Sequence, residues 1–227
     1  MDFTKKISVE EGQFLLSFCN NASPMFLLNY LFLQSLHITK HLPVFMGIMI
    51  GSSLLCGYIY LLFGYKKEAS AATTDNKASS IHIPSVTKSN SDSGSNPTPQ
   101  PAYFQILDHS IMNGFEIITK IGGYIILFSL LANLICTYTP FSELINAILI
   151  GLLEITTGIQ YISDSSLTFP VKLMLATALS AFGGLSSIAQ TGSVLLHSPL
   201  KLSTYVTYKL LNSIICFLAI FAYLNFI

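Results

Sequence analysis

Long apolar runs recur along this chain, separated by short polar stretches and by one long one. A run of about 18 or more apolar residues is long enough to cross a hydrocarbon core of about 30 Å as a helix. The pattern therefore predicts an all-α, polytopic helical membrane protein with about six membrane segments. They are expected at about 12–36, 43–63, 103–137, 141–162, 169–197 and 200–226.

The long polar stretch, residues 66–101, divides the chain into two membrane blocks, 1–65 and 102–227. It is rich in Ser, Thr, Asn, Asp and Pro, and it cannot bury enough apolar surface to offset its chain entropy. We therefore expect a disordered polar linker. Lysines flank the first block at both ends, which favours a cytoplasmic N-terminus and a cytoplasmic linker.

The first segment is interrupted near its middle, in "LLSFCNNASPMFLL" (15–28). Pro24 lacks an amide hydrogen and disfavours helical geometry at Ser23, so the helix must break or kink there. A hydroxyl residue followed by proline is also a helix start signal. The sequence predicts one half-helix that ends near Asn20 and Asn21 and a second that begins at Pro24.

The fifth segment is interrupted in "SAFGGLSSIAQTGS" (180–193). Gly183 and Gly184 permit the helix to unwind, and Ser187 with Gln190 three residues later matches a capping box. The many small and hydroxyl residues indicate that this segment faces protein or water rather than lipid.

Two interrupted helices in one membrane protein indicate a binding site. Non-helical backbone at membrane depth persists only where it is buried in protein or lines a wet cavity. Half-helix N-termini attract anionic or polar groups, and paired discontinuous helices are typical of transporter sites. The alternative is that both are kinked helices that serve only packing.

A carboxylate interrupts the apolar pattern of the fourth segment, "NAILIGLLEITTGIQY". A buried carboxylate is costly unless it is protonated or paired, so we expect Glu154 to point into the helix bundle. It either couples protons or contacts substrate, or it is a structural carboxyl bonded to the broken backbone of a neighbouring helix. On a continuous helix its face carries Asn146, Ala147, Gly151, Thr157, Gly158 and Tyr161.

These features define the candidate site and its substrate class. The expected ligand is a small polar or anionic solute. The candidate substrate-binding residues are Asn20, Asn21, Ser23, Glu154, Thr157, Gly183, Gly184, Ser187 and Gln190.

Composition supports the membrane interpretation and excludes several function classes. Of 227 residues, 52% are hydrophobic and 10% charged, against roughly 25% charged in an average soluble domain. A net charge of +0 gives no reason to expect nucleic acid as a partner. The four cysteines lie far apart within apolar runs, and no catalytic, phosphate-binding or metal-ligand motif is present. We expect no enzyme activity, no cofactor and no bound metal.

Two further patterns are expected to be structural. Gly47-x-x-x-Gly51 in the second segment would let another helix approach closely. Glu116 and Lys120 in the third segment have the i, i+4 spacing of an ion pair, and we expect this half of the segment to be an interfacial helix with solvated charges.

Three motifs, "EEGQFLLSFCNNASPMFLL", "GLLEITTGI" and "LSAFGGLSSIAQ", occur in this order. With them the chain resembles the YlbJ-type sporulation integral membrane proteins, which belong with the nucleoside-recognition Gate domains of nucleoside transporters and ferrous-iron transport permeases. The resemblance implies a multi-pass inner-membrane protein of an endospore-forming bacterium, associated with spore cortex formation. It also implies a transport-like architecture of two related halves, with no settled substrate.

Members of that group carry further membrane segments before the "LLSFCNN" motif, which in this chain lies close to Met1. We therefore expect that a second chain or a partner copy supplies the missing half-repeat, or that the chain is an inactive remnant. The two function hypotheses are a transport-related Gate-type protein in the lipid bilayer and a non-transporting scaffold in spore envelope assembly. The transport hypothesis predicts that the two interruptions and Glu154 meet in the fold, and the scaffold hypothesis does not.

Overall fold

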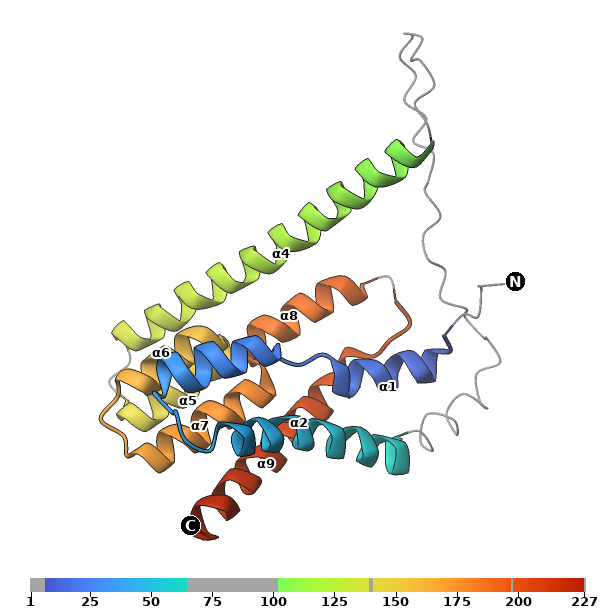
Figure 1. The fold of residues 1–227 in the computed structure, drawn as a ribbon. Helices are drawn as coiled ribbons and strands as arrows, with labels where there is room; N and C mark the ends of the chain where they lie inside the picture. Colours follow the sequence, from blue (N-terminus) through green and yellow to red (C-terminus); the bar gives the residue numbers. More distant parts are fainter. Residues whose placement is uncertain (1–6, 65–101, 139–140, 197, 227) are drawn as a thin grey trace.

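The computed structural model describes residues 7–64, 102–138, 141–196 and 198–226. Every regular element in these ranges is a helix (Figure 1). The predicted linker, 66–101, lies outside the described residues.

The first block contains two α-helices and two π-helical elements, whose backbone hydrogen bonds reach one residue further than in an α-helix. In chain order these are α1 (Val9–Cys19), η1 (Phe26–Ser35), α2 (Leu42–Ile59) and η2 (Tyr60–Gly64). The second block contains α4 (Ala102–Tyr138), α5 (Glu143–Leu153), α6 (Ile155–Asp164), α7 (Phe169–Phe182), α8 (Gly184–Leu195) and α9 (Leu202–Phe226).

Several helices begin at residues that suit the unpaired amides of a first turn. Ser8 and Glu11 form a capping box at α1: the Glu11 amide donates to Ser8 Oγ at 3.1 Å, and the Ser8 amide donates to Glu11 Oε2 at 2.9 Å. Helices α2 and α7 each carry a proline in their first two positions, Pro43 and Pro170. A proline is tolerated there because its missing N–H would have no partner within the helix.

Helix α9, which we call the central helix, packs against helices of both sequence blocks. It contacts α7 most extensively, and also α2, α1 and α8. Figure 1 shows it running obliquely across the molecule to the C-terminus. Its buried side chains recur at helical spacing and include three polar ones: Tyr205, Lys209 and Asn212 are followed by Cys216 and Ile220. The central helix therefore presents a partly polar face to its neighbours.

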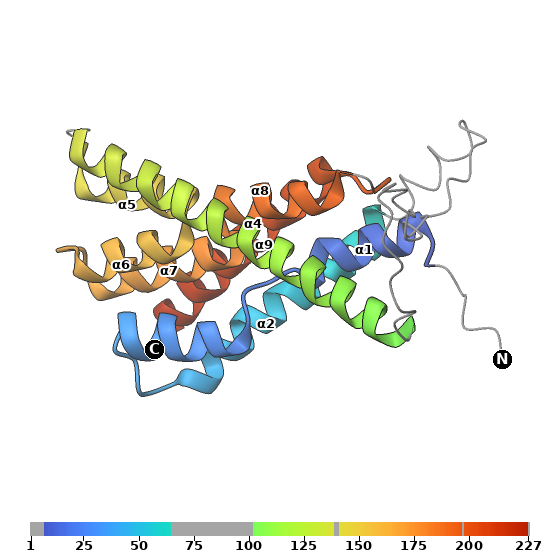
Figure 2. The same ribbon diagram turned by 90° about the horizontal axis from the view of Figure 1, so that it is seen from above.

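A side-chain amide joins the start of α1 to the start of α9. Gln13 is 1% exposed; its Nε2 donates to the carbonyl oxygen of Lys201 at 3.1 Å, and the Lys201 amide donates to Gln13 Oε1 at 2.7 Å. The start of α1, the end of α2 and the start of α4 also lie toward one side of the molecule (Figures 1 and 2). The two sequence blocks thus pack against each other.

Among the described residues, four helices are long and apolar enough to cross a membrane: Leu42–Leu62, Tyr103–Tyr138, Phe169–Leu195 and Leu202–Phe226. They indicate a protein embedded in a membrane. The expected count of about six is not reached in the described residues, because the segments predicted at 12–36 and 141–162 are each divided into shorter helices.

The segment predicted as a fourth crossing is a helical hairpin. Helix α5 ends at Leu153, Glu154 has extended backbone (φ −145°, ψ 123°), and α6 begins at Ile155. The two helices pack on each other through glycines, since a Cβ atom on Gly158 would overlap the backbone of Gly151. The expectation of a continuous helix was wrong because these glycines permit a close return of the chain, which apolar spacing does not reveal.

Helix α4 lies along one side of the molecule and contacts α5 and α8 (Figure 1). Only 6% of its most apolar window is buried. The predicted ion pair is confirmed, with Lys120 Nζ 2.5 Å from Glu116 Oε1 and both side chains exposed. No atom lies within 4 Å of the Cβ positions at Gly47 and Gly51 on α2, so the helix contact predicted for them is not made within the described chain.

The hairpin contact predicts that two glycine-to-alanine substitutions have opposite effects on stability. Gly158→Ala places a methyl group against the Gly151 backbone, and we expect it to lower the free energy of unfolding by about 2 kcal/mol or more. Gly47→Ala is the matched control, because its methyl group meets nothing and alanine favours a helix interior by up to about 1 kcal/mol. Thermal unfolding in detergent measures both, and equal melting temperatures would contradict the hairpin contact.

Candidate functional site

The chain leaves helical geometry between Cys19 and Pro24, in the region where the sequence predicts an interruption. Ser23 Oγ accepts a hydrogen bond from the Phe26 amide at 3.1 Å, and Pro24 opens the next helical stretch. The predicted start signal of Ser23 and Pro24 is therefore confirmed. Asn20, Asn21 and Ser23 are exposed.

Two asparagines connect this interruption to the second block. Asn20 Nδ2 donates to Thr191 Oγ1 on α8 at 2.9 Å and to Tyr205 Oη on α9 at 3.1 Å. Asn21 Oδ1 accepts a hydrogen bond from Lys209 Nζ on α9 at 2.9 Å. The first interruption thus contacts α8 and α9 directly.

Lys209 is the polar residue that sequence reasoning missed. It is 3% exposed, and its ammonium lies 5.9 Å from the centre of the Tyr205 ring, at the outer range of a cation–π contact. Among the described residues, no carboxylate lies within ion-pair distance of Lys209. The available signal was the helical spacing of Tyr205, Lys209 and Asn212 in an otherwise apolar segment.

A cavity of about 310 Å³ lies between residues 18–27, α2, α7 and α9. Asn21 and Ser23, two of the candidate site residues, line it together with Ser53, Ser180 and Asn212, and the rest of the lining is mostly apolar. We call this space the central cavity. It combines an apolar wall with a few polar groups, which is typical of sites for small organic ligands.

The second interruption is a left-handed turn between α7 and α8. Gly183 and Gly184 have φ angles of 89° and 76°, which glycine adopts without the steric penalty of a side chain. A Cβ atom on Gly184 would lie 3.3 Å from the carbonyl oxygen of Leu153 and 3.4 Å from the amide nitrogen of Ile155. The turn is therefore seated against the tip of the α5–α6 hairpin, on both sides of Glu154.

The predicted capping box of Ser187 and Gln190 is wrong. Helix α8 begins at Gly184 and has no side-chain cap, because the glycine turn starts the helix four residues before the pattern requires. Ser187 lies in the first turn, where its Oγ donates to the carbonyl oxygen of Gly184 at 3.4 Å. Gln190 Nε2 donates instead to Ser186 Oγ at 3.1 Å.

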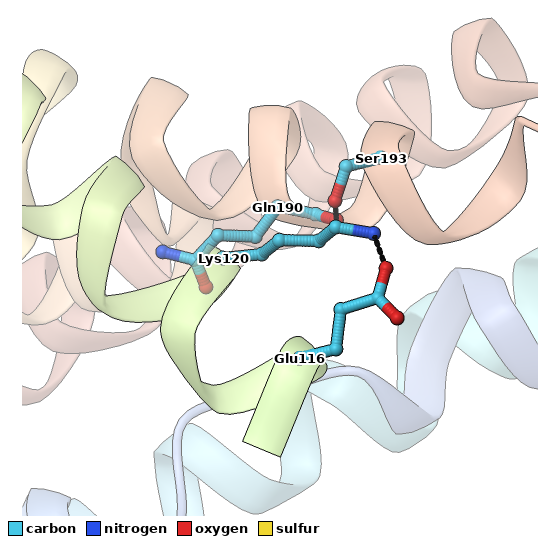
Figure 3. Close-up of polar contacts among 4 residues, drawn as sticks. All are labelled: Glu116, Lys120, Gln190 and Ser193. Atoms are coloured by element: carbon cyan, nitrogen blue, oxygen red, sulfur yellow. Dashed lines mark hydrogen bonds and ion pairs between the residues drawn. The ribbon is translucent and has the colours of Figure 1, made fainter. Parts of the chain in front are cut away.

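Gln190 belongs to the contact between α8 and α4. Figure 3 shows Gln190 and Ser193 on α8 near the Glu116–Lys120 pair of α4. Ser193 Oγ donates to the carbonyl oxygen of Gln190 at 2.8 Å. Gln190 is not among the residues that line the central cavity.

Glu154 caps a helix instead of projecting from the middle of one. Its Oε2 accepts hydrogen bonds from the Thr157 amide at 2.7 Å, from Thr157 Oγ1 at 2.9 Å and from Thr156 Oγ1 at 2.5 Å. The side chain is 1% exposed. These bonds resemble those expected of a structural carboxyl. The difference is that Glu154 bonds to the first turn of its own helix α6 and not to the broken backbone of a neighbouring helix.

The candidate residues divide into two polar regions on either side of Gly184. The residues of the first interruption gather near the central cavity and Lys209. Glu154 and Thr157 lie on the hairpin, where Thr157 Oγ1 is 3.0 Å from Ser129 Oγ of α4 and lines a separate groove of about 510 Å³. The two interruptions therefore share one region of the fold, whereas Glu154 lies outside the cavity.

Comparison of the chain with protein-family models, with curated proteins and with solved structures found no match. Within the described ranges, no three His, Cys, Asp or Glu side chains are grouped so that they could hold a metal ion. The polar atoms around the central cavity are therefore the basis on which a function can be argued.

The cap at Glu154 predicts different effects for two substitutions. Glu154→Gln keeps an acceptor oxygen for the Thr157 amide, and we expect a loss of stability of less than about 1 kcal/mol. Glu154→Leu leaves that amide without its acceptor, and we expect a loss of about 2 kcal/mol. Melting temperatures in detergent separate the two cases. If the Gln variant unfolds as easily as the Leu variant, the negative charge and not the acceptor oxygen stabilises the hairpin.

Proposed function

We propose that this chain is a Gate-type integral membrane protein with a transport-like architecture, and that its central cavity binds a small anionic or polar solute. The observation that carries the proposal is the buried ammonium of Lys209, held by Asn21 at an interrupted helix with no carboxylate in reach among the described residues. A buried charge without a counter-ion is strongly destabilising, and a bound anion would supply the missing partner.

The proposed arrangement in the bilayer has five crossings and one re-entrant hairpin. The four long apolar helices cross once each. Helices α1 and η1, which both pack on α2, form a fifth and discontinuous crossing that is interrupted near its middle. The α5–α6 hairpin enters from one side and returns, because α5 with its 11 residues is only about 16 Å long.

In this arrangement both interruptions lie at membrane depth, next to protein and near the central cavity. Such a place is where non-helical backbone is tolerated in a membrane. Helix α8 begins there without a side-chain cap, and the first turn of a helix has amides without partners inside the helix. This geometry supports a solute site of the kind found between the broken helices of transporters.

The distribution of positive charge supports a cytoplasmic N-terminus and linker. Lys5 and Lys6 precede α1, and Lys66 and Lys67 follow the first block. Lys201 lies on the same side, because its backbone is bonded to Gln13 in α1. An excess of lysine marks the cytoplasmic side of a membrane protein.

The resemblance of three sequence motifs supports a role in sporulation at the inner membrane, in spore cortex formation. The proposed partners are the lipid bilayer, the solute, and a second chain or copy. Asn21 and Ser23 are exposed and line the cavity, so such a partner would contact the cavity wall there.

Replacement of Lys209 separates this proposal from the scaffold hypothesis. In a sporulating strain without the native copy, Lys209→Gln removes the charge that would hold an anion, and we expect sporulation efficiency to fall at least about tenfold. Lys120→Gln is the matched control, because Lys120 is exposed and paired with Glu116, and it should sporulate normally. Both variants are compared at equal membrane abundance. Normal sporulation with Lys209→Gln would favour the scaffold.

A further inference from the structure

Two residues that line the central cavity each carry a buried polar atom that the protein leaves unpaired. Within the described residues, three buried side-chain nitrogen or oxygen atoms lack a hydrogen-bond partner: Ser35 Oγ, Ser180 Oγ and Asn212 Oδ1. Ser180 and Asn212 both line the central cavity and are 2% and 3% exposed. Buried polar groups are nearly always paired in folded proteins. Two unpaired polar groups on residues that line the same cavity therefore point to a ligand.

The orientation of the Asn212 amide defines what that ligand must offer. Asn212 Nδ2 donates to Ser53 Oγ at 3.3 Å and to the carbonyl oxygen of Ala181 at 3.4 Å. Both hydrogen atoms of the amide are thus directed to protein acceptors, and Oδ1 remains as an acceptor. A ligand that pairs with Oδ1 must donate a hydrogen bond to it.

A positive charge one residue behind the cavity lining defines a second requirement: Lys209 does not itself line the cavity, but it is bonded to a residue that does. Lys209 precedes Asn212 by one helical turn on α9, and it donates to Asn21, which also lines the cavity. The ammonium has three hydrogens, of which Asn21 accepts one. The ligand's negative group would therefore lie near Asn21, and its donor near Asn212 and Ser180.

We infer that the central cavity selects a small organic anion that has an apolar body and also carries a hydroxyl or N–H donor. The apolar part would contact Leu27, Met49 and Leu54, which form part of the lining. This inference rests on the proposed function, because it specifies the solute class of that site. An anion without a donor would leave Asn212 Oδ1 unpaired, and sites built to bond a donor discriminate strongly against analogues that lack it.

Mandelate and phenylacetate test the requirement, because they differ by one hydroxyl group on the same anionic, aromatic frame. Their affinities for the full chain, purified in detergent, are measured by isothermal titration calorimetry. We expect mandelate to bind at least about tenfold more tightly than phenylacetate. Asn212→Leu should reduce the affinity ratio to near one, and the smaller change Ser180→Ala should lower the ratio while phenylacetate still binds. Lys209→Gln should weaken both probes, and Lys120→Gln should weaken neither.

Equal affinities of the two probes, with both dependent on Lys209, would overturn the donor requirement and leave the anion site standing, with solvent pairing Asn212. A preference for mandelate that survives both Asn212→Leu and Ser180→Ala would overturn the assignment of these residues. Absence of binding, or binding that does not depend on Lys209, would overturn the anion site of the proposed function and this inference with it.

Discussion

A helix that stops within an apolar fold leaves its first amides and last carbonyls without partners, and this structure depends on how those groups are satisfied. At the first interruption the hydroxyl of Ser23 caps the next helix. At the hairpin the carboxylate of Glu154 does the same for α6. At the α7–α8 junction, Gly183 and Gly184 interrupt the helix with positive φ angles. The three interruptions thus depend on a serine, a glutamate and a pair of glycines, and a continuous helix that faces lipid would need none of them.

The same requirement accounts for the polar face of the central helix. Lys209 reaches Asn21 beside the first interruption, and Asn212 reaches the carbonyl oxygen of Ala181, two residues before the second. Helix α9 therefore packs against α7 and α2 and also supplies donors to both interruptions. A wholly apolar helix at this position would pack as well but would leave those acceptors unpaired.

Features that depend on residues close in sequence could be predicted, and features that depend on distant contacts could not. The cap at Ser23 and the ion pair of Glu116 and Lys120 each involve residues within four positions. The hairpin depends on contact between Gly151 and Gly158, whereas apolar periodicity identifies a face and not the path of the chain. The role of Lys209 requires knowing what surrounds it, since a lysine near a helix end otherwise serves only as a topology signal.

The contrast between satisfied and unsatisfied polar groups favours a ligand over a purely structural role. The groups that hold the interruptions in place, such as Ser23 and Glu154, have their hydrogen bonds, so this fold can satisfy polar atoms where structure requires it. Asn212 Oδ1 and Ser180 Oγ remain unpaired, at a cost of about 1–3 kcal/mol each. A scaffold would be more stable with alanine at Ser180, because removing an unpaired hydroxyl removes that cost. Ser180 and Asn212 line one cavity, next to a buried ammonium with no carboxylate in reach among the described residues, and this arrangement supports the proposed solute site.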